Sequence, residues 1–415
     1  MQRKANFSNG DTWAWAQSVP FAQSVEIGDQ VFVSGQQTLD AEGTVIDKGD
    51  IGAQTRNVFE NMKRVLAMSG LELSDLVRLN TYYVFDGDDK DATRYWEDMT
   101  RVRLEYFPDP GPAATAVRVK GMPYEGQLIQ IEGVAVNGES RRNRQRIMPD
   151  GSWDWSISVP LSQGWRIGQR IFVGGQISAD AQGKPVATGD VVAQTRNIYG
   201  FIQQVVLNAG GSLEDIVHVK ICFKHEDKAL EASGLSEILD VSTQFFGDPG
   251  PVFTAFGVDL LYPGLVLEID AMAIIDPERR PLKLPDLGGR YQPDIGSDGL
   301  SAAGEIYVGG QVSLAEDGSV LATDDVEEQA RVVFDRIGRV LAKDGAGLED
   351  VAKLNLFLVG RNGAADVADS FHKVARVWSE VAPDAHPAVT PVRVHELPRP
   401  GLLVQADVVA VKGSR

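Results

Sequence analysis

The sequence predicts an α+β protein built from three tandem domains of one fold, and three repeated segments indicate this. A nearly continuous apolar segment that ends in glutamine occurs at 31–36, 171–176 and 306–311. An Ala-Gln-Thr-Arg-Asn segment occurs at 53–57 and 193–197, and more loosely at 329–331. An Asp-Pro-Gly-Pro turn occurs at 109–112 and 248–251, with Ala-His-Pro at 385–387 as its third copy.

The spacing of these copies is that of whole domains. The apolar segments lie 140 and 135 residues apart, whereas solenoid repeats run to about 20–50 residues. A chain of 415 residues is long enough for roughly two to four domains, and the repeats indicate three. We therefore expect domains at 1–140, 141–280 and 281–415, packed around a pseudo-threefold axis.

Each copy is expected to form a strand, a helix, a second strand and a second helix, followed by two further strands. In the first copy the segment 30–36 is apolar enough for a buried strand. The helix that follows, 54–66, has apolar residues at helical spacing. Asp50 precedes this helix, and Gly70 is a suitable stop.

The second half of the copy continues this alternation. A strand is expected at 76–85 and an amphipathic helix at 92–107, which Pro108 ends. The segments 113–119 and 128–136 are expected to pair with each other as closing antiparallel strands.

Side chains alternate between the two faces of a strand, so the strand at 113–119 can be divided by parity. The face with Thr115 and Val117 is apolar after its threonine in every copy, and we expect it to pack under the helices. The opposite face, with Ala114 and Arg118, varies between copies. We expect that face to point to the place where the chemistry of the copies differs.

A carboxylate recurs inside the most apolar strand of each copy, as Glu132, Asp270 and Asp407. Gln130 lies two positions before Glu132 on the same strand face, and Glu268 has the same relation to Asp270. Burying an ionised carboxylate is costly unless the group is paired or used. Two interpretations stay open: a structural carboxylate that bonds a neighbouring backbone, and a general acid–base or substrate anchor whose pKa burial raises.

Composition and charge exclude several classes of function. The formal net charge is −18, and such a field repels phosphate backbones, so we expect no nucleic-acid partner. The basic run 141–146 lies at a domain junction and is interpreted as a solvated linker. No apolar run reaches the roughly 18 residues of a membrane span, and no apolar signal core follows Met1. We expect a cytoplasmic protein with no membrane partner.

Cysteine and histidine usage predicts neither a disulfide framework nor a metal site. Cys222 is the single cysteine, which fits a reducing compartment. The five histidines are scattered, and neither Cys-x-x-Cys nor His-x-x-x-His spacing occurs. We expect no cofactor and no metal.

In these segments the chain resembles the Rid family, also called the YjgF family. The matching segments of the first copy are 20–23, 34–36, 53–56, 112–119 and 131–136, and their order repeats in each copy. By that resemblance one copy is similar to a whole family member, which forms homotrimers of an α+β fold similar to chorismate mutase with ligand clefts between subunits. The chain therefore looks like a fused, trimer-like monomer whose clefts are free to differ; a higher oligomer stays open.

The best-known members of the family are imine deaminases, which hold the carboxylate of a 2-iminoacid with an arginine on the penultimate strand. The matching positions here are Ala114, Phe253 and Val389, so that arginine is absent from every copy. Because an arginine–carboxylate pair is bidentate, the standard 2-iminoacid reaction is not expected. Arg118 and Arg393, four residues further on, are either substitutes that reach back to substrate or rim charges that pair with acids.

Other positions of the family carry over unevenly. The tyrosine that covers the substrate matches Phe21, the cleft serine matches Ser34, and the asparagine of the second helix falls near Thr100. The glutamate that orients water matches Glu132 and is shortened to aspartate in the other copies. Thr115 is a further candidate donor of a hydrogen bond to the substrate.

Two pairs of tryptophans, Trp13 with Trp15 and Trp153 with Trp155, begin matching extensions that are not typical of the family. One interpretation is a strand edge packed on the neighbouring copy, since a tryptophan buries roughly 150–250 Å². The other is an aromatic wall that lines a cleft for a planar ligand.

Two functions remain open on the sequence alone. The first is a hydrolase or deaminase in which water attacks a C=N or amide-type carbon of a small nitrogen-containing ligand, in a cleft between adjacent domains, with Glu132, Asp270 and Asp407 in the catalytic role. The second is a non-catalytic protein that binds a small ligand or regulates through the same cleft. The absence of the family arginine favours the second.

Overall fold

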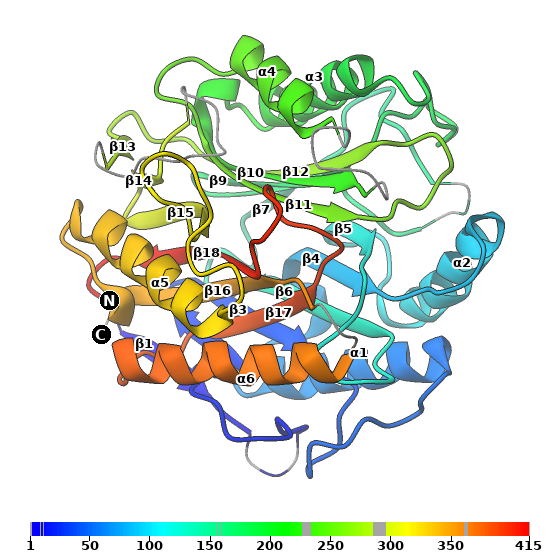
Figure 1. Ribbon diagram of the computed structural model, residues 1–415. Helices are drawn as coiled ribbons and strands as arrows, with labels where there is room; N and C mark the ends of the chain where they lie inside the picture. The colour runs from blue at the N-terminus through cyan, green and yellow to red at the C-terminus, as the bar shows by residue number, and fades with distance from the viewer. Residues whose placement is uncertain are drawn as a thin grey trace.

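The computed structural model describes residues 2–8, 10, 12–155, 157, 159–225, 234–284, 296–360 and 364–414. Each of the three domains contributes one six-stranded sheet. The sheets form the centre of the molecule and the helices lie on the outside (Figure 1). The α+β class and the threefold repetition that the sequence predicts are confirmed.

The first sheet has the strand order β1-β2-β3-β6-β4-β5, and the other two sheets repeat it. Domain 1 contains β1 (Arg3–Asn6), β2 (Ser24–Ile27), β3 (Gln30–Gln36), α1 (Ile51–Ala67), β4 (Leu76–Tyr83), α2 (Asp89–Tyr106), β5 (Ala113–Arg118) and β6 (Ile129–Val136). Domain 2 contains β7 (Arg144–Ile147), β8 (Gly164–Ile167), β9 (Arg170–Gln176), α3 (Val191–Asn208), β10 (Ile216–Lys224), α4 (Leu235–Phe245), β11 (Val252–Val258) and β12 (Leu267–Ile274). Domain 3 contains β13 (Arg280–Leu282), β14 (Gly299–Ala302), β15 (Glu305–Val312), α5 (Val326–Ala342), β16 (Val351–Leu358), α6 (Ala364–Val381), β17 (Ala388–Arg393) and β18 (Val404–Val411).

The first helix of each domain begins with the same local device. In α1 the Asp50 side chain accepts a hydrogen bond from the Ala53 N–H at 2.9 Å, and in α3 Asp190 does the same for Ala193. Such an N-cap satisfies one of the backbone donors that the first helical turn leaves free. After α1 the chain turns at Gly70, whose φ of 68° is readily adopted only by glycine.

The expected pairing of the last two strands is wrong. β5 pairs in parallel with β4, with Thr115 beside Asn80, and β6 lies between β3 and β4, antiparallel to both. The long connection through α2 explains this, because a crossover of a dozen or more residues returns the chain parallel to the strand it left. The last strand of the copy, β6, then lies between β3 and β4.

The chain between domains 1 and 2 is also more ordered than expected. Part of the basic run at 141–146 forms β7, the first strand of a hairpin that extends the second sheet. Arg146 pairs with Asp109 at 2.9 Å, and Arg141 pairs with Asp75. The interpretation of this run as a solvated linker is therefore wrong, because its guanidinium groups attach the second domain to the first.

The threonine face of β5 does not pack under the helices as expected, whereas Ala114 and Ala116 of the variable face line the space between domains 1 and 2. Ala114 packs against the domain 1 core that contains Phe59 and Trp96, so its face lies under the helices. Thr115 faces away from the helices and donates a hydrogen bond to Asp270 of domain 2 at 3.1 Å. The threonine face therefore meets the neighbouring domain, not the helices of its own.

The three domains close into a ring. β5 of domain 1 contacts β9 of domain 2, β11 of domain 2 contacts β15 of domain 3, and β17 of domain 3 contacts β3 of domain 1. We name these contacts seam 1/2, seam 2/3 and seam 3/1. Since each seam joins one domain to the next, a single chain here has the arrangement of a cyclic trimer.

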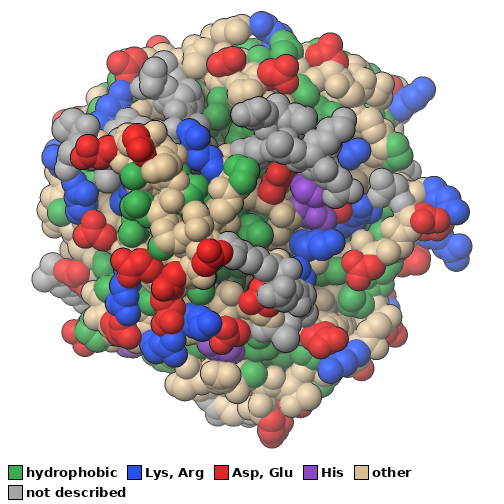
Figure 2. Space-filling view, viewed as in Figure 1, with side chains coloured by type: hydrophobic (Ala, Val, Ile, Leu, Met, Phe, Trp, Pro, Cys, Tyr) green, Lys and Arg blue, Asp and Glu red, His purple; other side chains and the backbone are tan. Residues whose placement is uncertain are grey.

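The outer surface carries charges of both signs. Figure 2 shows Lys, Arg, Asp and Glu side chains interspersed over the face that Figure 1 presents. Within the described ranges, none of the helices has the length and apolar character that crossing a bilayer requires.

Candidate functional site

At two of the three seams a glycine allows the backbones of neighbouring domains to lie close together. A Cβ on Gly174 of β9 would lie 3.0 Å from the backbone N and O of Ala114 in β5, and one on Gly309 of β15 would lie 2.7 Å from the carbonyl oxygen of Phe253 in β11. The repeated glycines therefore allow one backbone to approach the next. At seam 3/1 the matching residue is Ser34, which accepts a hydrogen bond from the Val389 N–H at 2.8 Å.

A cleft lies at seam 1/2, and the space between its walls, with the open solvent at its mouth included, is roughly 570 Å³. Helices α1 and α2 and strands β4 to β6 of domain 1 form one side. The other side is the domain 2 segment that carries Trp153 and Trp155, together with Gly174 and Gly175. The cleft wall is mainly apolar and aromatic, with threonine, serine and glutamine side chains between, as is typical of small-molecule sites.

Arg103 of α2 brings a positive charge into this cleft. Its Nη2 donates to the carbonyl oxygen of Pro160 at 3.3 Å, and its Nε is buried without a hydrogen-bond partner. None of the described residues gives Arg103 a carboxylate partner. Burial lowers the pKa of the Arg103 guanidinium to about 10, so the group is still cationic at neutral pH.

Glu268 of β12 lies directly behind the floor of the cleft. Its carboxyl group accepts a hydrogen bond from the backbone of Ala116. A Cβ on Gly175 would lie 2.1 Å from its Oε1, so the carboxyl group rests against bare backbone. Ala116 and Gly175 both line the cleft. Burial raises the pKa of the Glu268 carboxyl to about 8, and the neighbouring charge of Asp270 acts in the same direction.

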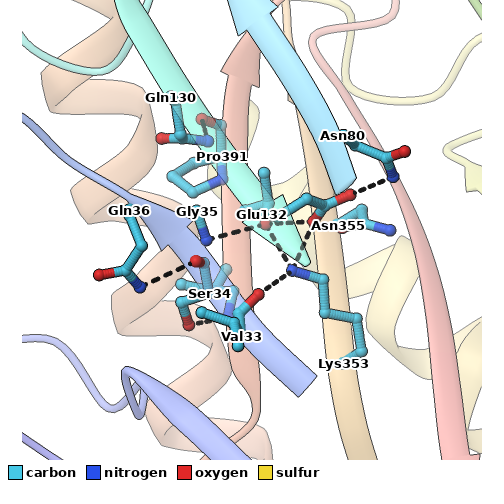
Figure 3. Close-up of polar contacts among 12 residues, drawn as sticks. Val33, Ser34, Gly35, Gln36, Asn80, Gln130, Glu132, Lys353, Asn355 and Pro391 are labelled. Atoms are coloured by element: carbon cyan, nitrogen blue, oxygen red, sulfur yellow. Dashed lines mark hydrogen bonds and ion pairs between the residues drawn. The ribbon is translucent and has the colours of Figure 1, made fainter. Parts of the chain in front are cut away.

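The three carboxylates that the sequence singled out lie elsewhere, and none of them lines this cleft. Figure 3 shows Glu132 at seam 3/1, between Asn80 of its own domain and Lys353 of domain 3. Asn80 Nδ2 donates to Glu132 Oε1 at 2.7 Å. Burial alone would raise the pKa of Glu132, but the Lys353 and Lys220 charges hold it at about 2.

The other two carboxylates occupy equivalent places at the other seams. Asp270 forms an ion pair with Arg78 of domain 1 and accepts the hydrogen bond from Thr115. Asp407 accepts from Asn355 at 2.7 Å, and burial raises the pKa of its carboxyl. Glu132 and Asp407 line a second, polar cavity where the three domains meet. These contacts are made to side chains, whereas the structural interpretation expected a bond to neighbouring backbone.

The candidate binding residues are also spread over several places. Thr100 lines the seam 1/2 cleft. Ser34 is fully buried and donates to the Ala22 carbonyl at 2.6 Å, while Thr115 faces Asp270. Phe21 lies in the core of domain 3, with its ring centroid 6.2 Å from that of Phe371. At seam 3/1 the space that corresponds to the cleft is thus occupied by aromatic side chains.

The two arginines offered as substitutes for the missing family arginine do not reach the described cleft. Arg118 pairs with Asp259 of domain 2 at 2.9 Å, and Arg393 donates to the carbonyl oxygen of Gly360 at 3.3 Å. For Arg118 this arrangement agrees with the interpretation of a rim charge that pairs with an acid.

The tryptophan pairs pack on the neighbouring copy, and one of the two pairs also lines a cleft. Neither pair lies in a strand, so the expected strand edge is wrong. Trp15 packs on Phe371 of domain 3 with ring centroids 5.0 Å apart, and Trp155 packs on Trp96 of domain 1 at 4.8 Å. Each pair therefore contacts the neighbouring copy, and the second pair also lines the seam 1/2 cleft.

Sequence reasoning did not single out Arg103, and it named Glu268 only as the residue that shares a strand face with Asp270. One signal for Glu268 was available, because Gly175 provides the bare backbone against which a buried carboxyl can lie. Domain 3 gives a second signal, since the residue that matches Ala116 is Pro391, which has no N–H to hold a carboxylate. There Gln130 donates its Nε2 hydrogen to the Pro391 carbonyl at 3.1 Å.

Comparison with known proteins gives one family three times. Residues 13–137, 156–275 and 294–412 each match the family model described as Endoribonuclease L-PSP. A RutC family protein of Pyrococcus abyssi is 38% identical over 116 residues, which is 28% of this chain and 85% of the relative. A 3-aminoacrylate deaminase RutC of Acinetobacter baylyi is 35% identical over 116 residues, or 28% of this chain and 86% of the relative.

Among solved structures, a chorismatase crystal structure covers 81% of this chain and 93% of its own, with a TM-score of 0.52. The two sequences are 15% identical, so this likeness concerns the fold alone.

Proposed function

Because this chain belongs to the Rid (YjgF) family that the Endoribonuclease L-PSP model describes, we propose that it is a hydrolytic enzyme of small nitrogen-containing molecules. Water attacks a C=N or amide-type carbon of a ligand bound in the seam 1/2 cleft, and Glu268 is the general acid–base. A relative that matches one domain is a 3-aminoacrylate deaminase, which supports C–N chemistry as the reaction class.

The state of Glu268 is the observation that carries this proposal. A carboxyl group whose pKa lies at about 8 is mostly protonated at neutral pH yet ionises easily. General acid–base catalysis is most efficient when the pKa of the group lies near the working pH. Glu268 also lies directly against Ala116 and Gly175, two residues that line the cleft.

With an imine ligand, the carboxyl group of Glu268 gives its proton to the nitrogen while a water oxygen bonds to the carbon. The carboxylate then takes one proton from that oxygen, which leaves a neutral carbinolamine. Return of the proton to the amino nitrogen lets the C–N bond break and ammonia leave. The hydroxyl proton returns to the carboxylate as the carbonyl forms, so Glu268 ends in its starting state.

The test is the Glu268→Gln variant, assayed by ammonia release from 3-aminoacrylate and a panel of aliphatic and aromatic imines. The fold accepts glutamine at this place, since Gln130 and Gln405 occupy it in the other domains. We expect turnover to fall by about 10²–10⁴-fold, with an unchanged melting temperature. A Glu268→Gln variant with the rate of the wild-type protein would contradict the proposal.

The same assay decides between Glu268 and the carboxylates that the sequence favoured. Glu132→Gln, Asp270→Asn and Asp407→Asn, made singly and together, are expected to lower the melting temperature because each removes a contact across a seam, to Lys353, Arg78 and Thr254 respectively. We expect the folded fraction of each to keep its turnover. A folded triple variant without turnover would place the catalytic role on those residues instead.

Ala114 stands where the family's imine deaminases carry their arginine, so we expect 2-iminobutanoate to be a poor substrate. Prompt ammonia release from 2-iminobutanoate would contradict this expectation. Absence of turnover across the whole panel, combined with thermal stabilisation by small amides or aromatic amines, would support the non-catalytic binding function.

A further inference from the structure

Within its own domain Arg103 lies over the Phe107 ring, with its Cζ 5.8 Å from the ring centroid, but the equivalent helices of the other domains have no arginine at this position. Aligned on the repeated turn at 109–112, the matching residues of α4 and α6 are Ser242 and Trp378. Ser242 bonds to the Tyr199 hydroxyl at 2.6 Å, and Trp378 is fully buried beside Phe21 and Phe334. The second helix of the domain therefore folds without an arginine at this place. A role specific to seam 1/2 is needed to account for Arg103.

Among the described residues that line the cleft, Arg103 alone carries a formal charge. Glu268 does not neutralise it, because the carboxyl group of Glu268 is mostly protonated at neutral pH. A partly buried guanidinium without an anionic partner is unfavourable. In a chain with a net charge of −18, a cleft whose single charge is positive is built for an anion.

The residues around Arg103 indicate the shape and polarity of the rest of the ligand. Thr100 lies one helical turn earlier on the same face of α2 and also lines the cleft. Trp96 and Trp155 close the wall with ring centroids 4.8 Å apart, one from each domain. Flat aromatic walls favour a flat, largely apolar body, whereas a guanidinium fork fits a carboxylate.

We propose that Arg103 is the anion anchor of the seam 1/2 cleft, and that its ligand is a small carboxylate with a flat, mainly apolar body. Arg103 stands on the helix side of the cleft, whereas Glu268 lies behind the floor. The ligand therefore spans the cleft, with its carboxylate at α2 and its nitrogen-bearing carbon toward Glu268. The inference rests on the proposed function in placing the ligand in this cleft and in directing its nitrogen-bearing carbon toward Glu268, whereas the role of Arg103 as anion anchor does not depend on turnover.

Equilibrium binding tests the inference without any need for turnover. Benzoate and benzamide have the same body and differ in charge, so isothermal titration with the full-length protein measures the contribution of the anion. We expect benzoate to bind at least about tenfold more tightly than benzamide, as a charge-assisted hydrogen bond to a guanidinium implies. Inorganic phosphate is expected to bind more weakly than benzoate, since it offers the aromatic wall nothing to contact.

Two variants show whether the preference depends on Arg103. Arg103→Met keeps the length of the side chain and removes its charge, and it is expected to abolish the preference for benzoate. Arg101→Met is the matched control, because Arg101 lies on the same helix with 62% of its side chain exposed, and it should keep the preference. Arg103→Lys is expected to keep part of the preference for benzoate over benzamide. This variant serves as the test if Arg103→Met does not fold.

Equal affinities for benzoate and benzamide, absence of benzoate binding at millimolar concentration, or an unchanged preference in folded Arg103→Met would each overturn the inference. A protein that prefers benzoate through Arg103 but shows no turnover would leave the inference standing while the proposed hydrolysis fails. The two claims are therefore separable.

Discussion

Two buried carboxyl groups on one face of β12 hold their protons very differently. Burial alone would raise the pKa of Asp270, but the Arg78 guanidinium beside it lowers that pKa below its ordinary value. Glu268, two residues earlier, has no such partner, and burial raises its pKa to about 8. The groups around each carboxyl therefore set its pKa, as in other sites where the pKa values of two acids differ because of their surroundings. Asp270 forms an ion pair across seam 1/2, whereas Glu268, which accepts a hydrogen bond from the Ala116 backbone, is the group to which we assign proton transfer in the proposed function.

The raised pKa of Glu268 predicts a particular pH dependence of stability. A carboxyl group that titrates at about 8 in the folded protein and near 4.3 in the unfolded chain favours the folded state at low pH. That contribution is lost as pH rises toward 8, at about 1.4 kcal/mol per pH unit. Urea unfolding of wild-type protein and Glu268→Gln should show a difference that grows in favour of the variant from about pH 5 to 8.

Above the folded pKa the difference between the two proteins should become constant, because the carboxyl group is then ionised in both states. A difference that does not change with pH would mean that Glu268 titrates normally. It would also remove the main support for Glu268 as the acid–base group.

At the scale of elements, the seams are made by strands that approach closely where a side chain is missing. Gly309 of β15 lies against the Phe253 backbone of β11, and a methyl group there would lie 2.7 Å from the carbonyl oxygen. Backbone cannot move away as a flexible side chain can. We expect Gly309→Ala to destabilise the protein by on the order of 1–3 kcal/mol, as overpacking does, measured by urea unfolding.

Gly200→Ala is the matched control for that change. Gly200 lies inside α3, and a Cβ there would meet nothing within 4 Å. Alanine is a better helix former than glycine by about 1 kcal/mol, so this variant should be slightly more stable than the wild-type protein. A Gly309→Ala variant as stable as Gly200→Ala would contradict the close approach of β15 to β11 as the reason for glycine at position 309.

Some strands and helices could be predicted from the sequence and others could not. Apolar segments and helical spacing predicted β3 and α1 well, because both signals are local. The strand order was not predictable in the same way, since β6 pairs with β3 and β4 across a long stretch of sequence. The hairpin of β1 and β2 was missed for a related reason, as both strands are only four residues long.

At the scale of the whole molecule, fusion lets the three seams differ. Seam 1/2 combines Arg103, Glu268 and an open cleft. Seam 3/1 has Trp378 at the position of Arg103 and Gln130 at that of Glu268, and Phe21 packs into the corresponding space. A homotrimer cannot differ in this way, because identical subunits make identical interfaces.

This asymmetry predicts the binding stoichiometry. If the charge and the open space coincide only at seam 1/2, titration with benzoate should saturate at one molecule per chain. The Trp155→Ala variant, which removes part of that cleft wall, is expected to weaken binding at this single site. Three equivalent sites per chain would contradict the assignment of function to one seam.

The sequence by itself determined the fold class and the three copies, because these are properties of repeated local segments. Only the tertiary structure decided which groups meet in the cleft. Parity places Glu268 and Asp270 on one face of a strand, but the approach of the neighbouring domain decides that Ala116 and Gly175 meet the first while Arg78 meets the second. The physical reason is that each seam joins strands more than forty residues apart in the chain, and no local pattern records which side chains such strands bring together.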